Sequence, residues 1–275
     1  MADTPTFQGG TAASETLTGS TGQDLIWGQG GADTLIGGDG NDGLYSGEYV
    51  VGTTTTTPDF IGDRLDGGAG SDQLTGGSGS DLLIGGAGTN YLGGGGGYDT
   101  AIYAGMRGDY TVAMHNGMPV GVTAPAGPTD TLSSIERLSF SDTSIAFDID
   151  GNAGNIYRLY RAAFDRKPDE AGLGYWISIA DKNVSSTFIA NSLMDSDEFR
   201  DLYGTRVSDE QFLTQVYANV LDRAYDQAGF DYWIDKMAEG VSRGDVLNLI
   251  AQDTENSAAV IGEIRSGIAY DIYTA

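Results

Sequence analysis

The sequence predicts a chain of two parts, a coil of short parallel β-strands followed by an all-α domain. Three observations support this fold class. Glycine accounts for 43 of the 275 residues and is concentrated in the first hundred positions. A nine-residue pattern recurs between Gly10 and Ile102, and a second, longer pattern with helical periodicity recurs after residue 150. Fixed-period repeats predict structural units that stack on one another.

The first repeat follows the pattern GGxGxDxUx, in which U is a bulky aliphatic residue, and it is clearest in GGAGSDQLT and GGSGSDLLI, residues 67–84. The nine turns begin at Gly10, Gly19, Gly28, Gly37, Pro58, Gly67, Gly76, Gly85 and Gly94. The sixth position holds Glu15, Asp24, Asp33, Asp42, Asp63, Asp72, Asp81, Asn90 and Asp99. The eighth holds Leu17, Ile26, Leu35, Leu44, Leu65, Leu74, Leu83, Leu92 and Ala101. This pattern predicts a regular coil over residues 1–102, interrupted by an inserted loop at 46–57.

The spacing of the repeat has a direct chemical consequence. Glycines permit a tight bend at positive φ, so backbone carbonyls and one carboxylate converge in each turn. A short strand follows, with its aliphatic residue pointing inward, and two nonapeptides complete one coil. Oxygen ligands from two stacked turns supply the six or more positions that calcium accepts, whereas magnesium fits such an adaptable cage less well. The sequence therefore predicts several bound calcium ions and a coil that is disordered without them.

These residues resemble the repeats-in-toxin family of calcium-binding nonapeptide proteins, whose fold is the parallel β-roll. The segments from Asp24 to Asp42 and from Asp63 to Asp81 fit its long signature. The resemblance implies a calcium ligand at each of Asp24, Asp33, Asp42, Asp63, Asp72, Asp81, Asn90 and Asp99. Three positions depart from the family pattern. Asn90 lacks the negative charge of an aspartate, which predicts weaker calcium sites at its turn. Glu15 lies in a degenerate first turn that serves as a cap, and Ile61 replaces an expected glycine.

Export is also an expectation from the resemblance. Such proteins usually leave Gram-negative cells unfolded through the type I secretion machinery, reading an uncleaved C-terminal signal, and fold in external calcium. The N-terminal segment MADTPTFQGG has neither a basic start nor an apolar run, and the chain contains no cysteine. Both features agree with a secreted protein that is stabilised by ions instead of disulfides.

Charge and composition exclude several classes of function. The net charge is −25, and residues 1–150 contain 19 acidic residues and three arginines, which argues against binding nucleic acid or an anionic membrane. No segment approaches the ~18 apolar residues of a membrane span. The single histidine, His115, leaves no zinc site of the HExxH kind, and no nucleophile is paired with a base, so we expect no enzymatic activity.

Residues 103–150 are predicted to form capping β-hairpins. Alternating residues at 109–115 and 118–124 flank an Asn116-Gly117 turn, and a further strand segment follows. The later segment resembles the strands that close such rolls, through Asp130, Leu132, Ile135, Glu136, Phe140 and Asp142. We expect it to cover the open end of the coil.

Residues 151–275 are predicted to form a helical bundle of two repeats with about eight helices. Residues 156–177 match residues 213–234 at an offset of 57, and capping boxes mark helix starts at Ser208 and Ser242. The pattern resembles a domain of unknown function that often follows calcium repeats in secreted bacterial proteins. That resemblance implies no activity.

Two groups of residues are candidates for ligand contact. Trp27 and Tyr45 occupy the outward ninth position of turns two and four and should be neighbours on one sheet, where they would form a platform for sugar rings or be covered by another segment. Asp165, Arg166, Trp176, Asp222, Arg223 and Trp233 form two equivalent DRxxDxxG-YW motifs. These motifs would be paired glycan sites, or would cap and hold a tight loop with the Trp in the core.

The sequence therefore favours a secreted, calcium-binding, non-enzymatic structural or interaction protein of the cell surface or extracellular matrix. The alternative is a calcium-dependent adhesin that binds surface or extracellular polysaccharide.

Overall fold

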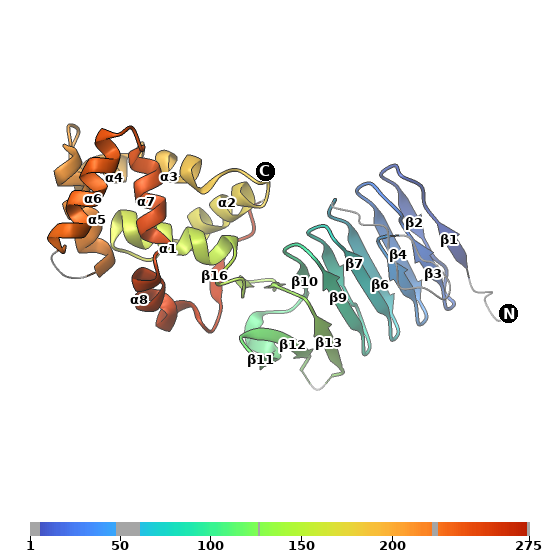
Figure 1. The fold of residues 1–275 in the computed structure, drawn as a ribbon. Coiled ribbons are helices and arrows are strands. Elements are labelled where there is room, and N and C mark those ends of the chain that lie inside the picture. Colours follow the sequence, from blue (N-terminus) through green and yellow to red (C-terminus); the bar gives the residue numbers. More distant parts are fainter. Residues whose placement is uncertain (1–5, 48–60, 126, 222–224, 274–275) are drawn as a thin grey trace. The chain divides into compact units, whose positions relative to one another are not determined.

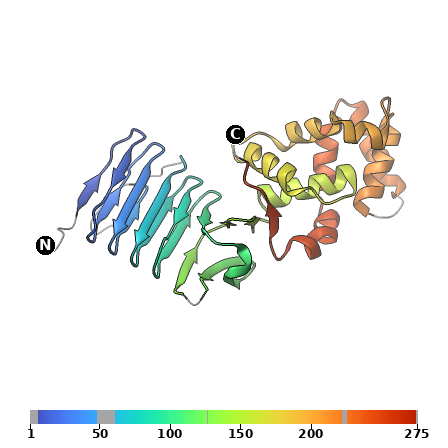
Figure 2. The same ribbon diagram turned by 180° about the vertical axis from the view of Figure 1, so that it is seen from behind.

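The computed structural model describes residues 6–47, 61–125, 127–221 and 225–273. The chain divides into two compact units, Met1–Phe147 and Asp148–Ala275, and the strands predicted to cap the roll belong to the first. The predicted fold class is confirmed: the first unit is a two-sheet parallel β-roll with antiparallel capping strands, and the second is helical (Figures 1 and 2).

The coil alternates between two sheets, because each nonapeptide contributes one short strand. Odd-numbered strands form one sheet in the order β1-β3-β5-β7-β9 and even-numbered strands form the other in the order β2-β4-β6-β8-β10. The strands are β1 (Phe7–Gly9), β2 (Thr16–Thr18), β3 (Leu25–Trp27), β4 (Thr34–Asp39), β5 (Gly43–Tyr45), β6 (Arg64–Ala69), β7 (Gln73–Gly77), β8 (Leu82–Ile84), β9 (Tyr91–Gly95) and β10 (Thr100–Ile102). Two nonapeptides therefore complete one coil, as the sequence predicted.

Strand register shows where the coil is interrupted. Thr16 of β2 pairs with Thr34 of β4, an offset of one coil, whereas Thr34 pairs with Arg64 of β6. The larger offset accommodates the inserted residues without shifting the phase of the strands. The predicted insertion at 46–57 lies outside the described residues from position 48 onward.

The aliphatic residues of the eighth position form the core between the two sheets. Leu17 is 8% exposed and the others are fully buried. The fully buried members are Ile26, Leu35, Leu44, Leu65, Leu74, Leu83, Leu92 and Ala101. Because each turn contributes a single such side chain, each sheet supplies only one column of apolar side chains to the core.

The capping segment continues both sheets before it leaves them. It comprises the 3-10 helix η1 (Arg107–Asp109), β11 (Thr111–His115), β12 (Met118–Thr123), β13 (Thr129–Ser133), β14 (Arg137–Ser139) and β15 (Ser144–Ala146). Strand β13 is parallel to β9 and β14 is parallel to β10, while β12 and β15 pair antiparallel to them. Asn116 and Gly117 both have positive φ in the β11–β12 turn, which confirms the predicted hairpin.

The second unit consists of two sets of four helices. They are α1 (Asn152–Phe164), α2 (Glu170–Ala180), α3 (Ser186–Met194), α4 (Asp197–Tyr203), α5 (Asp209–Leu221), α6 (Gln227–Ala238), α7 (Arg243–Ala251) and α8 (Thr254–Ile264). The helices of the second set begin 57 residues after their counterparts, which confirms the predicted duplication. A short strand, β16 (Ile268–Tyr270), follows, and Asp271 N donates to Glu170 O at the start of α2.

Side-chain caps define the helix starts of this unit. Ser208 N donates to Gln211 Oε1 at 3.0 Å and Gln211 N donates to Ser208 Oγ at 3.2 Å, so the predicted capping box is formed. Ser242 Oγ caps α7 by accepting from Asp245 N at 3.1 Å, but the Asp245 carboxylate accepts from the Ser242 hydroxyl, so this cap differs from the reciprocal box at Ser208. None of the helices in the described part of the chain combines the length and hydrophobicity needed to cross a bilayer.

Candidate metal centre

The side chains of the sixth position stack into two rows, one along each edge of the roll. The first row precedes the strands of the odd-numbered sheet and contains Asp24, Asp42, Asp72 and Asn90. The second row precedes the strands of the even-numbered sheet and contains Glu15, Asp33, Asp63, Asp81 and Asp99. All of the Asp and Asn members are at most 3% exposed.

Each row is tied together by one hydrogen bond per coil. Asp24 N donates to Asp42 Oδ1 at 2.8 Å, and Asp42 N donates to Asp72 Oδ1 at 2.8 Å. In the second row, Asp81 N donates to Asp99 Oδ1 at 2.8 Å. One carboxylate oxygen therefore holds the neighbouring coil and the other remains for a second partner.

The second oxygen lies beside a backbone carbonyl of the next coil. A β-carbon placed on Gly37 would lie 2.3 Å from Asp42 Oδ2 and 2.6 Å from Gly67 O. The equivalent distances at Gly67 are 2.5 Å to Asp72 Oδ2 and 2.8 Å to Gly85 O. Only glycine leaves this space open, and it is bordered by two oxygens.

Several of these carboxylates are buried without a hydrogen-bond donor for the second oxygen. Oδ2 of Asp42, Asp72 and Asp99 is shielded from solvent and has no hydrogen-bond partner among the described residues. An unsatisfied buried anionic oxygen is strongly unfavourable unless a cation coordinates it. Buried carboxylate and carbonyl oxygens together form a donor set that fits calcium.

Burial and mutual repulsion raise the pKa values of these groups. Burial, reinforced by the charges of Asp72 and Asp24, raises the pKa of Asp42 to about 6. Burial, reinforced by Asp81 and Glu136, raises the pKa of Asp99 to about 8. These groups resist ionisation in the absence of a cation, as expected of stacked carboxylates in a site of low dielectric constant.

In the N-terminal turns, the carboxylate oxygens accept hydrogen bonds from within their own turn. Asp24 Oδ2 accepts hydrogen bonds from Ser20 N at 2.5 Å and from Ser20 Oγ at 3.0 Å. Although burial acts in the opposite direction, the donors of Ser20 and Thr6 lower the pKa of Asp24. Glu15 accepts from Thr11 N at 2.6 Å and from Thr11 Oγ1 at 3.0 Å. In both turns, a Ser or Thr residue early in the turn donates hydrogen bonds to the carboxylate. The carboxylate therefore depends less on a cation for its stability.

Two row members come from the capping segment and were missed in the sequence. Asn90 N donates to Asp130 Oδ1 at 2.9 Å, and Asp99 N donates to Glu136 Oε2 at 2.9 Å. Asp130 and Glu136 therefore end the first and second rows. Their signal was the acid-x-Leu spacing that they share with the nonapeptides, in Asp130-Thr131-Leu132 and Glu136-Arg137-Leu138.

Among the described residues, no three His, Cys, Asp or Glu side chains lie close enough together to hold a metal ion by themselves. In the rows, the oxygens that approach each carboxylate belong to the backbone of the next coil, as at Gly67 and Gly85.

The outward aromatic pair is placed as predicted. Trp27 is the register partner of Tyr45, and both are half-buried on the outer face of the odd-numbered sheet. The indole of Trp27 covers Gly9, where a β-carbon would lie 2.4 Å from its Nε1. Tyr45 borders a hollow of about 580 Å³ that is also lined by Phe7, Gln23, Gly43 and Gln73 and by the first-row residues Asp24, Asp42 and Asp72.

The first DRxxDxxG-YW motif is held by contacts within the helical unit. Asp165 ends α1 in a left-handed conformation, with φ 52°, and Asp169 caps α2 through Gly172 N at 2.7 Å. Arg166 donates to both oxygens of Glu198, from Nε at 2.5 Å and from Nη2 at 2.7 Å. These contacts fix the loop between α1 and α2.

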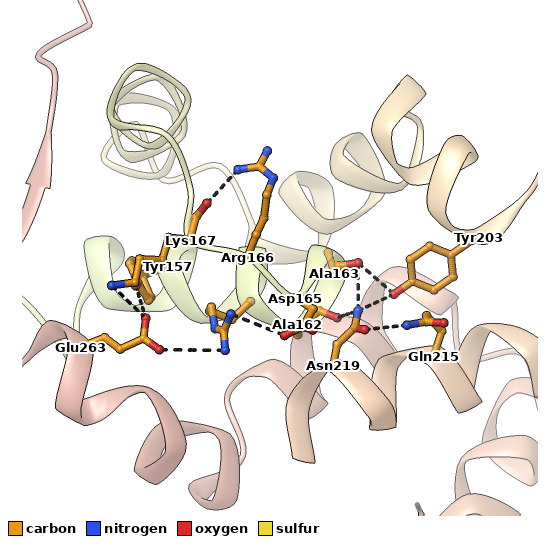
Figure 3. A network of polar contacts seen from close by, with 11 residues as sticks. Tyr157, Ala162, Ala163, Asp165, Arg166, Lys167, Tyr203, Gln215, Asn219 and Glu263 are labelled. Atoms are coloured by element: carbon orange, nitrogen blue, oxygen red, sulfur yellow. Dashed lines mark hydrogen bonds and ion pairs between the residues drawn. The ribbon is translucent and has the colours of Figure 1, made fainter. Parts of the chain in front are cut away.

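The neighbouring polar groups also serve to join helices (Figure 3). Glu263 in α8 accepts from Tyr157 Oη at 2.6 Å and pairs with Arg161 and Lys167 at 3.9 and 3.7 Å. Asn219 in α5 donates to Ala162 O at the end of α1, at 2.9 Å.

The second motif is described only in part. Asp222 and Arg223 lie outside the described residues. Trp176 and Trp233 are half-buried, which differs from the core position considered in the sequence. Each indole instead packs edge-on against the preceding tyrosine at 4.8 and 5.0 Å, and Tyr175 and Tyr232 are exposed.

Comparison with known families agrees with this geometry. The family model "RTX calcium-binding nonapeptide repeat (4 copies)" matches residues 9–44 and 63–101, and "Domain of unknown function (DUF4214)" matches residues 190–260. A comparison with curated proteins found no match. The chain therefore carries RTX calcium-binding nonapeptide repeats in its N-terminal part and a DUF4214 domain in its C-terminal part, which confirms both resemblances. RTX repeats bind calcium, and proteins that contain them are usually secreted.

A side chain at the first glycine of a turn would fill the space between the carboxylate and the carbonyl oxygen. Gly37→Ala places a methyl group against Asp42 Oδ2 and Gly67 O, and overpacking of this kind costs about 1–3 kcal/mol. We expect the calcium concentration at the midpoint of folding to rise about tenfold or more. Circular dichroism during a calcium titration measures this. Gly108→Ala is the matched control because no atom lies within 4 Å of its added β-carbon, and an equal shift in both variants would contradict the assignment.

Because the pKa values of Asp42 and Asp99 are raised, the stability of the calcium-free roll should depend on pH. A carboxyl group whose folded pKa exceeds its unfolded value, ~4, binds more protons in the folded state, so its contribution to stability is lost as pH rises. With Asp42 at about 6 and Asp99 at about 8, the folded fraction of the calcium-free roll should increase on acidification from pH 8 to pH 5. Strand ellipticity in chelator measures this. A calcium-free roll that gains structure as pH rises would refute it.

Proposed function

We propose that this chain is a secreted, non-enzymatic structural or interaction protein of the cell surface or extracellular matrix, whose β-roll folds when it binds external calcium. The observation that carries the proposal is the pair of buried carboxylate rows. Asp42 and Asp72 are stacked on consecutive coils, and each directs a buried oxygen toward a backbone carbonyl. Such an arrangement is stable only when cations balance the charge.

The row residues would act as the calcium ligands. Asp33, Asp42, Asp63, Asp72, Asp81 and Asp99 would each supply one carboxylate oxygen, and the carbonyls of the stacked turns would supply others. Asp24 would contribute less, because Ser20 already satisfies its second oxygen. The calcium supplies the positive charge that allows the rows to ionise. The protein's own residues hold adjacent coils in register through one hydrogen bond per row member.

Secretion follows from the same physical property. Inside a cell, where free calcium is scarce, the rows would repel and the roll would stay unfolded, which suits passage through a type I secretion channel. The helical unit has its own core, centred on α1 with buried Ile156, Leu159 and Ala163, and would form the contact-making part. Cell fractionation should place the native protein outside the cytoplasm.

Calcium-coupled folding is tested by circular dichroism of the full chain in chelator, followed by added calcium. We expect the strand signal to be absent in chelator and to appear on calcium addition, while the helical signal changes little, because no carboxylate row lies among the described residues of the helical unit. Magnesium at the same concentration serves as the control cation and should be much less effective. Full strand signal in chelator at neutral pH would disprove the proposal.

A calcium-dependent adhesin that binds extracellular polysaccharide is the second candidate. The hollow beside Gly43 favours it, because the aromatic residues Tyr45 and Phe7 line it together with the amide residues Gln23 and Gln73. Aromatic faces flanked by amides are suited to sugar rings. The half-buried Trp176 and Trp233 would be further contact points.

A glycan array run with and without calcium tests the adhesin. We expect binding by the wild type to require calcium and to fall at least tenfold in Tyr45→Ala. Phe188→Ala removes an exposed aromatic side chain of α3 that lies outside both DRxxDxxG-YW motifs, so this control variant should bind as the wild type does. Absence of binding by the calcium-loaded wild type, or equal binding by Tyr45→Ala, would eliminate this candidate.

A further inference from the structure

The capping segment ends the two carboxylate rows in different ways. The second row ends on Asp99 and Glu136, and the first row ends on Asn90 and Asp130. At every other turn with a first-position glycine, a carbonyl oxygen of the following coil or cap lies within 2.8 Å of a β-carbon placed on that glycine. Gly85, which opens the Asn90 turn, has no such carbonyl among its three nearest described atoms. This difference decides what each row can bind at the capped end of the roll.

At the end of the second row, the capping segment supplies the missing oxygen. A β-carbon placed on Gly94 would lie 2.1 Å from Ser134 O and 2.3 Å from Asp99 Oδ2. Asp99 is fully buried, and its Oδ2 has no hydrogen-bond partner among the described residues. Ser134 adopts a left-handed conformation, with φ 50°, which non-glycine residues seldom adopt. The carbonyl of the cap thus stands where the first glycine of a further nonapeptide would place its own.

At the end of the first row, neither a carboxylate oxygen nor a carbonyl oxygen is among the three described atoms nearest to the added β-carbon. The three atoms nearest to a β-carbon on Gly85 all belong to Asn90, namely Nδ2 at 2.6 Å, Cγ at 3.0 Å and Cβ at 3.1 Å. Among the described residues, no carbonyl comes as close as at the other turns. The amide orientation is set by its neighbours, because Asp72 N donates to Asn90 Oδ1 at 3.0 Å. A hydrogen-bond donor therefore occupies the place of the carboxylate oxygen.

The donor of Asn90 already has a partner. Asn90 Nδ2 donates to Asp130 Oδ1 at 3.0 Å, and the same oxygen accepts from Asn90 N at 2.9 Å. Beyond this turn, Tyr103, Tyr110 and Val122 line a hollow of about 360 Å³ together with the turn's own Gly86 and Gly88, and Asp130 also borders it. The region where a following nonapeptide loop would stack is thus bordered largely by apolar side chains.

We infer that the cap completes a final calcium site from Asp99 Oδ2 and the Ser134 carbonyl, and that the Asn90 turn is a metal-free position closed by the hydrogen bonds between Asn90 and Asp130. This inference rests on the proposed calcium binding by the roll. It assigns a metal-binding role to the capped end of the second row and none to the capped end of the first row. The two edges of the roll consequently hold unequal numbers of ions. Residues of the capping segment take part in metal binding on one edge only.

The test is a count of calcium ions bound to the full chain, by metal analysis after gel filtration in calcium. Asp99→Asn keeps the acceptor for Asp81 N and reproduces the native Asn90 arrangement, so we expect one ion fewer than in the wild type. Asn90→Asp adds a carboxylate without the missing carbonyl, and we expect an unchanged count. Asp109→Asn, which removes an exposed carboxylate of the same unit outside the rows, should also leave the count unchanged.

The role of the Ser134 carbonyl has a separate test that leaves every carboxylate in place. Ser134→Gly tolerates the left-handed backbone and should keep the full count, whereas the β-branched side chain of Ser134→Val disfavours it and should lose the same single ion. An unchanged count in Asp99→Asn or in Ser134→Val would overturn the final site, and one additional ion in Asn90→Asp would overturn the metal-free position. A wild type without bound calcium would instead refute the proposed function itself.

Discussion

Stacking of buried carboxylates at the spacing of one coil is the constraint on which the first unit depends. Each row member holds the preceding coil through a hydrogen bond to its backbone N–H, so the side chain cannot move away from its neighbours. Adjacent members such as Asp42 and Asp72 therefore repel one another at the strand spacing of ~4.8 Å. The coil can be regular and ionised only if cations lie between its turns.

The narrow core makes this dependence stronger. Each turn buries one aliphatic side chain, and the two sheets have no other apolar layer between them over residues 16–45 and 64–102. The capping segment adds what the repeats lack, since Tyr103, Tyr110 and Phe140 form an aromatic cluster with ring centroids 5.2–5.7 Å apart. The same segment covers the backbone edges of β9 and β10, which would otherwise be open to pairing with other chains.

The helical unit is stabilised by a different principle. Buried polar side chains join its helices, and Arg158 donates to Gln252, Ile149 O and Asn155 at 2.6–2.8 Å. The two halves have diverged at such positions: Asn219 binds the end of α1, whereas its counterpart 57 residues earlier is Ala162. The duplication therefore preserves the helix framework, while individual contacts tie one half to the other.

The sequence by itself determined the period of the roll, the row and core positions up to Asp99, the hairpin at Asn116-Gly117 and the duplicated helices. Each of these follows from short-range spacing, which fixes the face on which a side chain lies. Only the tertiary structure decided that Asp130 and Glu136 continue the rows, because about forty residues separate them from Asn90 and Asp99. It also decided that Ser20 satisfies Asp24, that Trp176 and Trp233 are only half-buried, and that Asn90 turns its amide toward Asp130. These outcomes depend on which donors and acceptors meet in three dimensions, and residue spacing does not specify them.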